Sequence, residues 1–137
     1  MATLRREIPV ANGAAPVWQK LREFDEVHTK VAPGFLTDLR MEGGDRILTF
    51  FNGMVARERL VTLDDESRRL VYSVVEGRAS HYNAAVQVYS DGDDDSRVVW
   101  TIDLLPDELA PAIAGMMDAA VKVMAKRLAQ DAVDVRT

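Results

Sequence analysis

The sequence predicts an α+β fold in which a curved antiparallel sheet of about seven strands packs against one long C-terminal helix. Two observations lead to this prediction. Apolar and polar residues alternate with a period of two between residues 35 and 104, which is typical of half-buried strands. Beyond residue 107 the apolar residues recur at helical spacing as far as residue 129. Because a sheet and an amphipathic helix bury their apolar faces most economically against each other, we expect the helix to lie across the concave face of the sheet.

The first part of the chain is expected to form one strand and two short helices. Residues 5–10 have the alternation of a strand, and Pro16 suits the first turn of a helix. Asp25 is a candidate N-cap for a second short helix that reaches about Lys30, before Pro33 and the following glycine. The first helix shows four apolar residues at helical spacing: Val17, Trp18, Leu21 and Phe24.

Six further strands are expected in the central part of the chain. Short turns rich in glycine, asparagine and aspartate separate them, so consecutive strands should pair antiparallel as a meander. The expected strands are 35–41, 46–51, 55–63, 69–75, 81–89 and 97–104.

The long helix is expected to begin after Pro106, with Asp107 as its N-cap and Glu108 near the positive end of the helix dipole. Pro111 falls early enough in the helix to be tolerated. The apolar stripe contains three methionines, which suit either an adaptable ligand-binding wall or an ordinary core. Its members are Ile113, Met116, Met117, Ala120, Val121, Met124 and Leu128.

Length and composition indicate one soluble domain. The chain has 137 residues, of which 47% are hydrophobic and 28% charged, so we expect a single domain over residues 1–137. It contains no cysteine, which excludes disulfides, thiolate nucleophiles and metal sites built on sulfur. No apolar run has the length of a signal peptide or a membrane span, so a cytoplasmic location without a membrane span is the default expectation.

The charge balance argues against nucleic acid as a partner. Seventeen basic residues against 22 acidic ones give a net charge of −5, which repels phosphate backbones. The closest approach to a basic cluster consists of Arg57, Arg59, Arg68 and Arg69. Acidic residues are interleaved with these arginines, which favours a solvated sheet face of mixed charge.

The sequence motifs of most enzyme classes are missing. There is no glycine-rich phosphate loop, no pair of histidines flanking a glutamate and no serine flanked by glycines. The two histidines, His28 and His81, are too few for a multi-histidine metal site within one chain. The acidic turn at 91–95 does not match a calcium loop, because Ser96 and Ile102 stand where glycine and glutamate are required. We therefore expect neither a metal nor a cofactor.

A few polar residues stand among apolar neighbours on the predicted strands. On the strand 55–63, Glu58 shares its face with Ala56, Leu60 and Thr62. If Glu58 points inward, it is a candidate ligand contact or acid/base group. The alternative is that it faces water and pairs with an arginine of a neighbouring strand.

Three aromatic residues raise a similar question. Tyr72 and Tyr82 each lie on a strand whose same-face neighbours are largely apolar, so each could present its hydroxyl to a cavity. The alternative for both is a core tyrosine whose hydroxyl reaches the rim of the sheet or a backbone carbonyl. Trp100, with Ile102 and Leu104 on its face, is expected in the core rather than at a ligand.

Two segments carry a resemblance to a known family. Residues 15–25, APVWQKLREFD, resemble the first helix of the polyketide cyclase/dehydrase-like branch of the SRPBCC (START/Bet v 1-like) superfamily. Residues 58–68, ERLVTLDDESR, resemble the glutamate-arginine-leucine strand and acidic hairpin of that branch. The second segment, together with His81 and Tyr82, is also similar to the plant abscisic acid receptors. With the order of the elements, the resemblance covers essentially the whole chain.

This resemblance implies a helix-grip fold with a deep cavity between the sheet and the long helix. At the matching positions the receptors place ligand-facing side chains, which here are Glu58, Tyr72 and Tyr82 on the sheet and Met116, Ala120 and Met124 on the helix. The chain departs from the receptors in two respects. A shorter segment, 52–55, replaces their Gly-Leu-Pro-Ala lid, and no lysine stands at their carboxylate-pairing position, so abscisic acid is not the expected ligand.

Three functional hypotheses remain open at this stage. The preferred one is a non-catalytic carrier or sensor that binds a small, mostly apolar molecule such as a lipid, an aromatic compound or a polyketide. The alternative is a cyclase/aromatase or dehydratase-like enzyme in which Glu58 acts as the acid/base group. A third is a protein that acts through a partner surface. A monomer and a homodimer are both compatible with the sequence.

Overall fold

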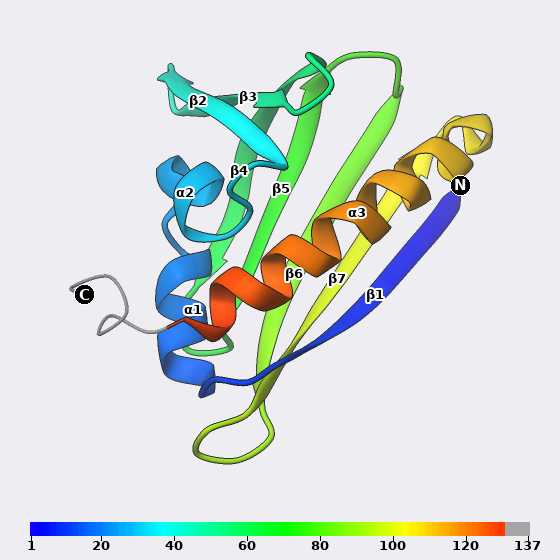
Figure 1. The fold of residues 1–137 in the computed structure, drawn as a ribbon. Coiled ribbons are helices and arrows are strands. Elements are labelled where there is room, and N and C mark those ends of the chain that lie inside the picture. Colours follow the sequence, from blue (N-terminus) through cyan, green and yellow to red (C-terminus); the bar gives the residue numbers. More distant parts are fainter. Residues whose placement is uncertain (131–137) are drawn as a thin grey trace.

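The computed structural model describes residues 1–130, and the end of the predicted domain, residues 131–137, lies outside the described residues. Within residues 1–130 the chain forms seven strands, two short α-helices after the first strand and one long helix near the end (Figure 1). The strands are β1 (Ala2–Val10), β2 (Leu36–Glu42), β3 (Asp45–Phe50), β4 (Val55–Asp64), β5 (Arg69–Glu76), β6 (His81–Ser90) and β7 (Ser96–Leu105). The α-helices are α1 (Ala14–Leu21), α2 (Val27–Lys30) and α3 (Ala110–Ala129).

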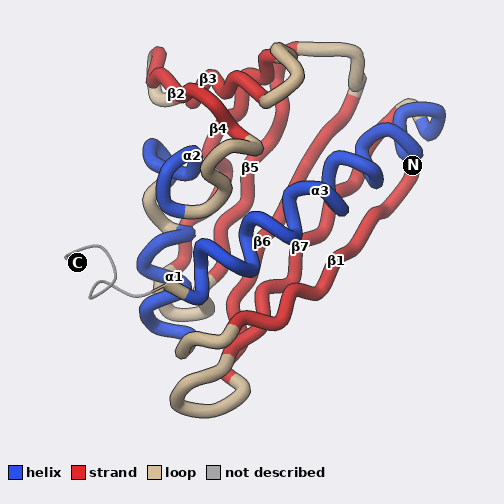
Figure 2. The backbone as a smooth tube through the Cα atoms, viewed as in Figure 1, coloured by secondary structure: helices blue, strands red, loops and turns tan. Residues whose placement is uncertain are grey.

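The strands form one antiparallel sheet in the order β1-β7-β6-β5-β4-β3-β2. Strands β2 to β7 therefore follow one another as a meander, and β1 joins the far edge by pairing with β7. The sheet curves, and α3 lies across its inner face (Figure 2). The short helix α2 packs beside β2, and α1 packs against β6 and β7. The predicted helix-grip fold, with its two short helices and its long C-terminal helix, is confirmed.

The inner face of the sheet and one side of α3 form the core. Alternate residues of β7 are fully buried, among them Val98, Ile102 and Leu104. Four residues of the predicted stripe are buried on α3: Met117, Ala120, Met124 and Leu128. Among residues 1–130, no helix combines the length and the apolar character that crossing a bilayer would require.

Two helix caps differ from the sequence prediction. Asp107 does not cap the long helix, because a 3-10 turn over Asp107–Leu109 precedes it and α3 begins three residues later. Asp25 likewise lies inside a 3-10 turn, Phe24–Glu26, and makes no side-chain cap for α2. In both places the acidic residue was predicted as a cap, but the tighter turn places it ahead of the first α-helical residue. Pro111 falls in the first turn of α3, as expected.

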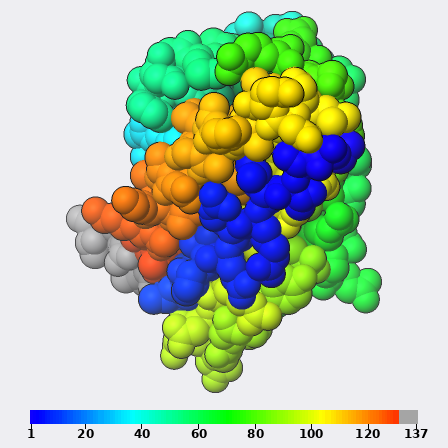
Figure 3. Space-filling view, turned by 90° about the vertical axis from the view of Figure 1, so that its right-hand side faces the viewer, coloured from blue at the N-terminus to red at the C-terminus, as the bar shows by residue number. Residues whose placement is uncertain are grey.

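Contacts between distant segments hold the long helix against the sheet. Arg6 on β1 donates from Nε to Asp118 Oδ1 on α3 at 2.6 Å, and Asn12 donates from Nδ2 to the backbone carbonyl of Leu128 at 3.1 Å. Figure 3 shows the corresponding face, where the blue strand β1 lies beside the orange helix α3. At Gly13, which precedes α1, an added Cβ would lie 2.6 Å from the carbonyl oxygen of Asp93, so the close approach there requires glycine.

Strand β4 does not keep the uniform alternation that the sequence suggested. Its register against β5 shifts between Leu60 and Thr62, as in a β-bulge. Glu58 lies on the inner face, but Leu60 is 37% exposed and Leu63, rather than Thr62, packs against the core. The extra residue at the bulge exchanges the faces of all residues that follow it.

Candidate functional site

A cavity of about 210 Å³ lies between the sheet and α3. Its walls are mainly apolar because the inner positions of β3 to β7 and the buried stripe of α3 both face it. The helix contributes Ile113, Met116, Met117, Ala120 and Met124. A concave, mostly apolar space with a few polar groups is the usual form of a small-molecule site.

The exposed lining residues indicate where the cavity meets solvent. Met54 and Val55 follow the turn between β3 and β4, and Gly77 and Arg78 lie in the connection between β5 and β6. Leu109, just before α3, also lines this end. The mouth of the cavity therefore lies between these two connections and the start of the long helix.

One ion pair is buried in the wall of the cavity. Arg46 on β3 and Glu58 on β4 stand directly opposite each other in the strand register. Arg46 Nε and Nη2 each lie 2.8 Å from the same carboxylate oxygen, Glu58 Oε1. The Arg46 Nη1 donates to the backbone carbonyl of Phe24 at 3.1 Å. The two side chains are only 5% and 7% exposed, so most of the pair is shielded from water.

Aromatic rings flank the Arg46 guanidinium. Its central carbon lies 4.0 Å from the centre of the Phe24 ring and 4.9 Å from the centre of the Tyr72 ring. Both distances lie within the range of a cation–π interaction. The positive charge of Arg46 is therefore compensated by one carboxylate and two ring faces of the protein itself.

Glu58 has one oxygen that no protein group engages. Both nitrogens of Arg46 bind Oε1, and among residues 1–130 no donor binds Oε2. Burial raises the pKa of the Glu58 carboxyl group above its ordinary value, while the charge and hydrogen bond of Arg46 oppose this shift. Glu58 lines the cavity, and its second oxygen is available as a hydrogen-bond acceptor.

Two tyrosines and a tryptophan add hydrogen-bonding groups to the same wall. Burial raises the pKa of Tyr72 far above its ordinary value, and the nearby Glu58 charge adds to this shift. Burial, together with the proximity of Tyr72 and Glu58, also raises the pKa of Tyr82 well above its ordinary value. Both hydroxyls therefore stay protonated near neutral pH and are available as donors.

Trp100 also lines the cavity, whereas the sequence placed it in the core. Its indole nitrogen is buried without a hydrogen-bond partner in good geometry, although it lies close enough to the Tyr72 hydroxyl to oppose the rise in that tyrosine's pKa. The rest of the ring packs against the core, as expected. Glu58, Tyr72, Tyr82 and Trp100 thus give the inner wall polar groups with unused hydrogen-bonding capacity.

The six residues suggested by the resemblance come together around this one cavity. Glu58, Tyr72 and Tyr82 line it from the sheet, and Met116, Ala120 and Met124 line it from α3. Their role in binding a ligand stays a prediction. Sequence reasoning missed Arg46, which the alternation of charged and apolar residues near the start of β3 did not distinguish from a surface arginine.

A different charge arrangement is found around the start of β3. Asp45 is 3% exposed, and its carboxylate accepts hydrogen bonds from Arg57 Nε at 2.7 Å and from Arg59 Nε at 3.0 Å. The hydrogen bonds from Arg59 and Arg57 lower the pKa of Asp45 to about 2. Two of the four arginines considered as a basic cluster are therefore neutralised within the protein.

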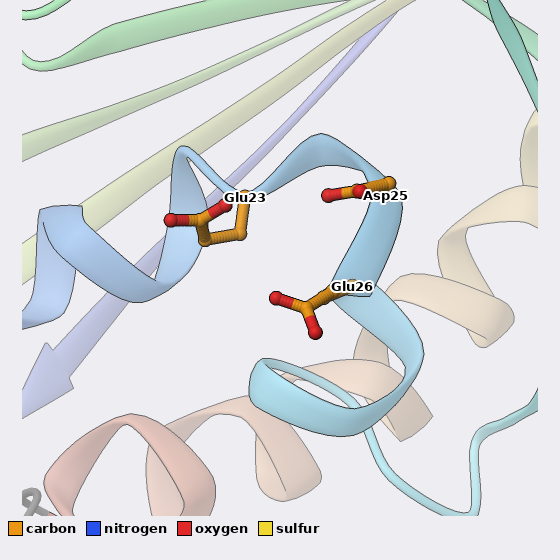
Figure 4. Close-up of side chains that lie close together, drawn as sticks. All are labelled: Glu23, Asp25 and Glu26. Carbon is orange, nitrogen blue, oxygen red and sulfur yellow. The ribbon is translucent and has the colours of Figure 1, made fainter.

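Three acidic side chains lie close together beside α2. Glu23, Asp25 and Glu26 each have a carboxylate oxygen within 4.8 Å of the others (Figure 4). The Lys30 ammonium binds Glu26 at 2.8 Å and offsets part of this negative charge. The three residues are half-exposed or exposed, and none of them lines the cavity. We assign it no function.

Comparison with solved structures finds the same fold in several proteins. Protein XoxI from Bacillus cereus is 21% identical with a TM-score of 0.81, and the match covers 100% of this chain and 99% of that one. A protein from Thermobifida fusca is 31% identical with a TM-score of 0.74, covering 94% and 91%. Norcoclaurine synthase from Thalictrum flavum, solved with dopamine and hydroxybenzaldehyde, is 18% identical with a TM-score of 0.71, covering 93% and 84%.

Comparison with curated protein sequences finds no match. The family model described as "Polyketide cyclase / dehydrase and lipid transport", in contrast, matches residues 1–133. That match spans nearly the whole chain, and the observed helix-grip architecture agrees with it. The chain therefore belongs to the polyketide cyclase/dehydrase and lipid transport family.

Proposed function

We propose that this protein is a carrier or sensor that binds one small, mostly apolar molecule in the cavity between the sheet and α3. The observation that carries this proposal is the set of unused polar groups in an otherwise apolar wall. Glu58 Oε2 lacks a donor, and the Trp100 indole nitrogen lacks a partner in good geometry. A buried polar group without a partner, such as the Trp100 indole nitrogen, is costly, and a bound molecule that pairs with it removes that cost.

The apolar part of the wall supports binding rather than chemistry. Apolar side chains of α3 and of the strands make up most of the lining, and these can bury a hydrocarbon surface but cannot transfer protons. Norcoclaurine synthase, which shares the fold, was solved with dopamine and hydroxybenzaldehyde bound. This precedent supports small aromatic molecules as ligands of the architecture, although the two sequences are only 18% identical.

The proposal is tested by native mass spectrometry of the purified protein beside a denatured control, followed by solvent extraction of any molecule that copurifies. We expect a small apolar or aromatic species at one copy per chain. Ala120→Phe should abolish its copurification, because Ala120 is 1% exposed and lines the cavity, so a phenyl group there occupies the binding space.

Ala119→Phe is the matched control, since Ala119 is the neighbouring residue on the exposed side of α3. It should leave binding unchanged. Circular dichroism of both variants reports whether they remain folded. Equal loss of the molecule from two folded variants, or a protein that carries nothing and binds none of a panel of apolar compounds, contradicts the proposal. A ligand recovered in chemically altered form would instead favour an enzyme that uses Glu58 as its acid/base group.

A further inference from the structure

The volume of the cavity limits the size of a fully enclosed ligand. An engineered apolar cavity of about 150 Å³ in a protein core holds one benzene molecule. The cavity of this protein measures about 210 Å³. It therefore accommodates one six-membered ring with one or two small substituents, while a longer molecule would project through the mouth.

The charges in the wall limit the polar group of the ligand. Arg46, the buried cation of this wall, binds Glu58 Oε1 through two nitrogens and the Phe24 carbonyl through a third. The rings of Phe24 and Tyr72 lie close to its guanidinium. An incoming carboxylate placed beside this pair would lose its hydration without gaining a free cation, because Arg78, which also lines the cavity, lies at the exposed mouth. It would also lie beside the Glu58 carboxyl group.

The same wall offers partners to a hydroxyl group. Glu58 Oε2 can accept a hydrogen bond, and no described residue donates to it. Tyr82 also lines the cavity, and its hydroxyl can donate to the ligand oxygen. One hydroxyl group could therefore donate to Glu58 and accept from a tyrosine at the same time.

We propose that the cavity selects an uncharged molecule of about one aromatic ring that carries a hydroxyl group, with Glu58 accepting its hydrogen bond, and that it rejects carboxylates. This inference rests on the proposed function, because it names the class of ligand for the same cavity. Glu58 is the specificity-determining residue. Its carboxyl group both neutralises Arg46 and provides the free acceptor.

The test compares four probes of matched size at pH 7 by chemical-shift titration of isotopically labelled protein. The probes are 4-methylphenol, 4-methylanisole, 4-methylbenzoate and toluene. We expect 4-methylphenol to bind at least tenfold more tightly than 4-methylanisole, which cannot donate, since one hydrogen bond to a buried charged group contributes about that factor. 4-Methylbenzoate should show no saturable binding.

Glu58→Gln should invert this preference. The glutamine carbonyl can accept from Arg46, which leaves its NH2 group facing the cavity and leaves the arginine without a counter-charge. 4-Methylbenzoate should then bind at least tenfold more tightly than 4-methylphenol. An unchanged ratio in this variant, or a wild-type protein that binds the carboxylate as well as the phenol, overturns the inference.

Tyr82→Phe provides a second test in case Glu58→Gln does not fold. It should weaken the binding of 4-methylphenol by about tenfold and leave the binding of toluene unchanged, because the substitution removes only a hydrogen bond. Tyr89→Phe is the control, since Tyr89 lies on β6, is 38% exposed and binds Gln87 rather than lining the cavity. If toluene binds and 4-methylphenol binds no more tightly than toluene, the inference about the hydroxyl group fails while the proposed function stands. If no probe binds and no apolar compound of any size does, the proposed function fails as well.

Discussion

Arg46 and Glu58 stand opposite each other on β3 and β4, and two arginine nitrogens bind the same carboxylate oxygen at 2.8 Å. This geometry has two consequences. It buries a charged pair inside the wall of an apolar cavity, where each partner depends on the other. It also leaves the second Glu58 oxygen, Oε2, without a hydrogen-bond donor among residues 1–130.

Removing the arginine should destabilise the protein strongly. Arg46→Met leaves the Glu58 carboxyl group buried without its partner, and breaking one side of a buried pair costs about 3–5 kcal/mol. We expect the free energy of unfolding at pH 7, measured in urea, to fall by about 3 kcal/mol or more. The control is Arg59→Met, because the Arg59 side chain is 58% exposed and its partner Asp45 keeps a second arginine, Arg57. Equal losses in the two variants would show that burial of the pair has no special effect.

The stability contributed by Glu58 should decrease as pH rises. Burial raises the pKa of this carboxyl group in the folded protein above 4.5, so the folded state holds its proton more firmly than the unfolded state. The contribution is complete below about pH 4.5 and is lost as pH rises through the raised pKa. Glu58→Gln cannot titrate. The difference in free energy of unfolding between wild type and variant, measured from pH 4 to pH 8, should therefore decline; a constant difference would refute the assigned shift.

The stability contributed by Asp45 should depend on pH in the opposite way. Hydrogen bonds from Arg59 and Arg57 lower its pKa from 3.8 to about 2, so its contribution is complete above about pH 4 and is lost as pH falls toward 2. The stability difference between wild type and Asp45→Asn should shrink over that interval in thermal or urea unfolding. Arg59→Met should weaken the effect, because its hydrogen bond is the largest cause of the shift. A difference that grows as the pH falls would contradict this assignment.

Two glycine-to-alanine substitutions should change the free energy of unfolding in opposite directions. Gly13→Ala would place a Cβ 2.6 Å from the carbonyl oxygen of Asp93, so the turn before α1 must shift and the protein should lose stability. Gly115 lies inside α3, where an added Cβ meets no atom within 4 Å. Gly115→Ala should therefore raise the free energy of unfolding by about 0.5–1 kcal/mol through the better helix propensity of alanine. Thermal melts of both variants check the signs, and a stabilising Gly13→Ala would refute the close contact.

The elements of the fold could be predicted because their signals are local. The alternation of apolar residues along β7 and the helical spacing on α3 are visible within a single segment, and the short turns fix the antiparallel order of consecutive strands. The caps at Asp25 and Asp107 were predicted wrongly for a related reason. An aspartate within a 3-10 turn and one at the N-cap of an α-helix look the same in sequence, and only the hydrogen-bond spacing that follows distinguishes them.

The Arg46–Glu58 pair could not be predicted because it depends on register. A two-residue turn at Asn52 and Gly53 would pair residue 51 with residue 54, and hence Arg46 with Arg59. The observed register is offset by one residue and pairs Arg46 with Glu58. Such an offset exchanges the partner of every residue on β4, and nothing in the composition of the turn determines it.

By itself, the sequence determined the order of strands and helices, the apolar stripe on α3 and the small set of polar residues set among apolar neighbours, because these follow from periodicity and turn chemistry within short segments. Only the tertiary structure decided that Glu58 points inward, that Arg46 occupies one of its oxygens and that Tyr72, Tyr82 and Trp100 border the same cavity. Those relationships depend on strand register, a bulge in β4 and the packing of α3 on the sheet, which join residues far apart in the chain.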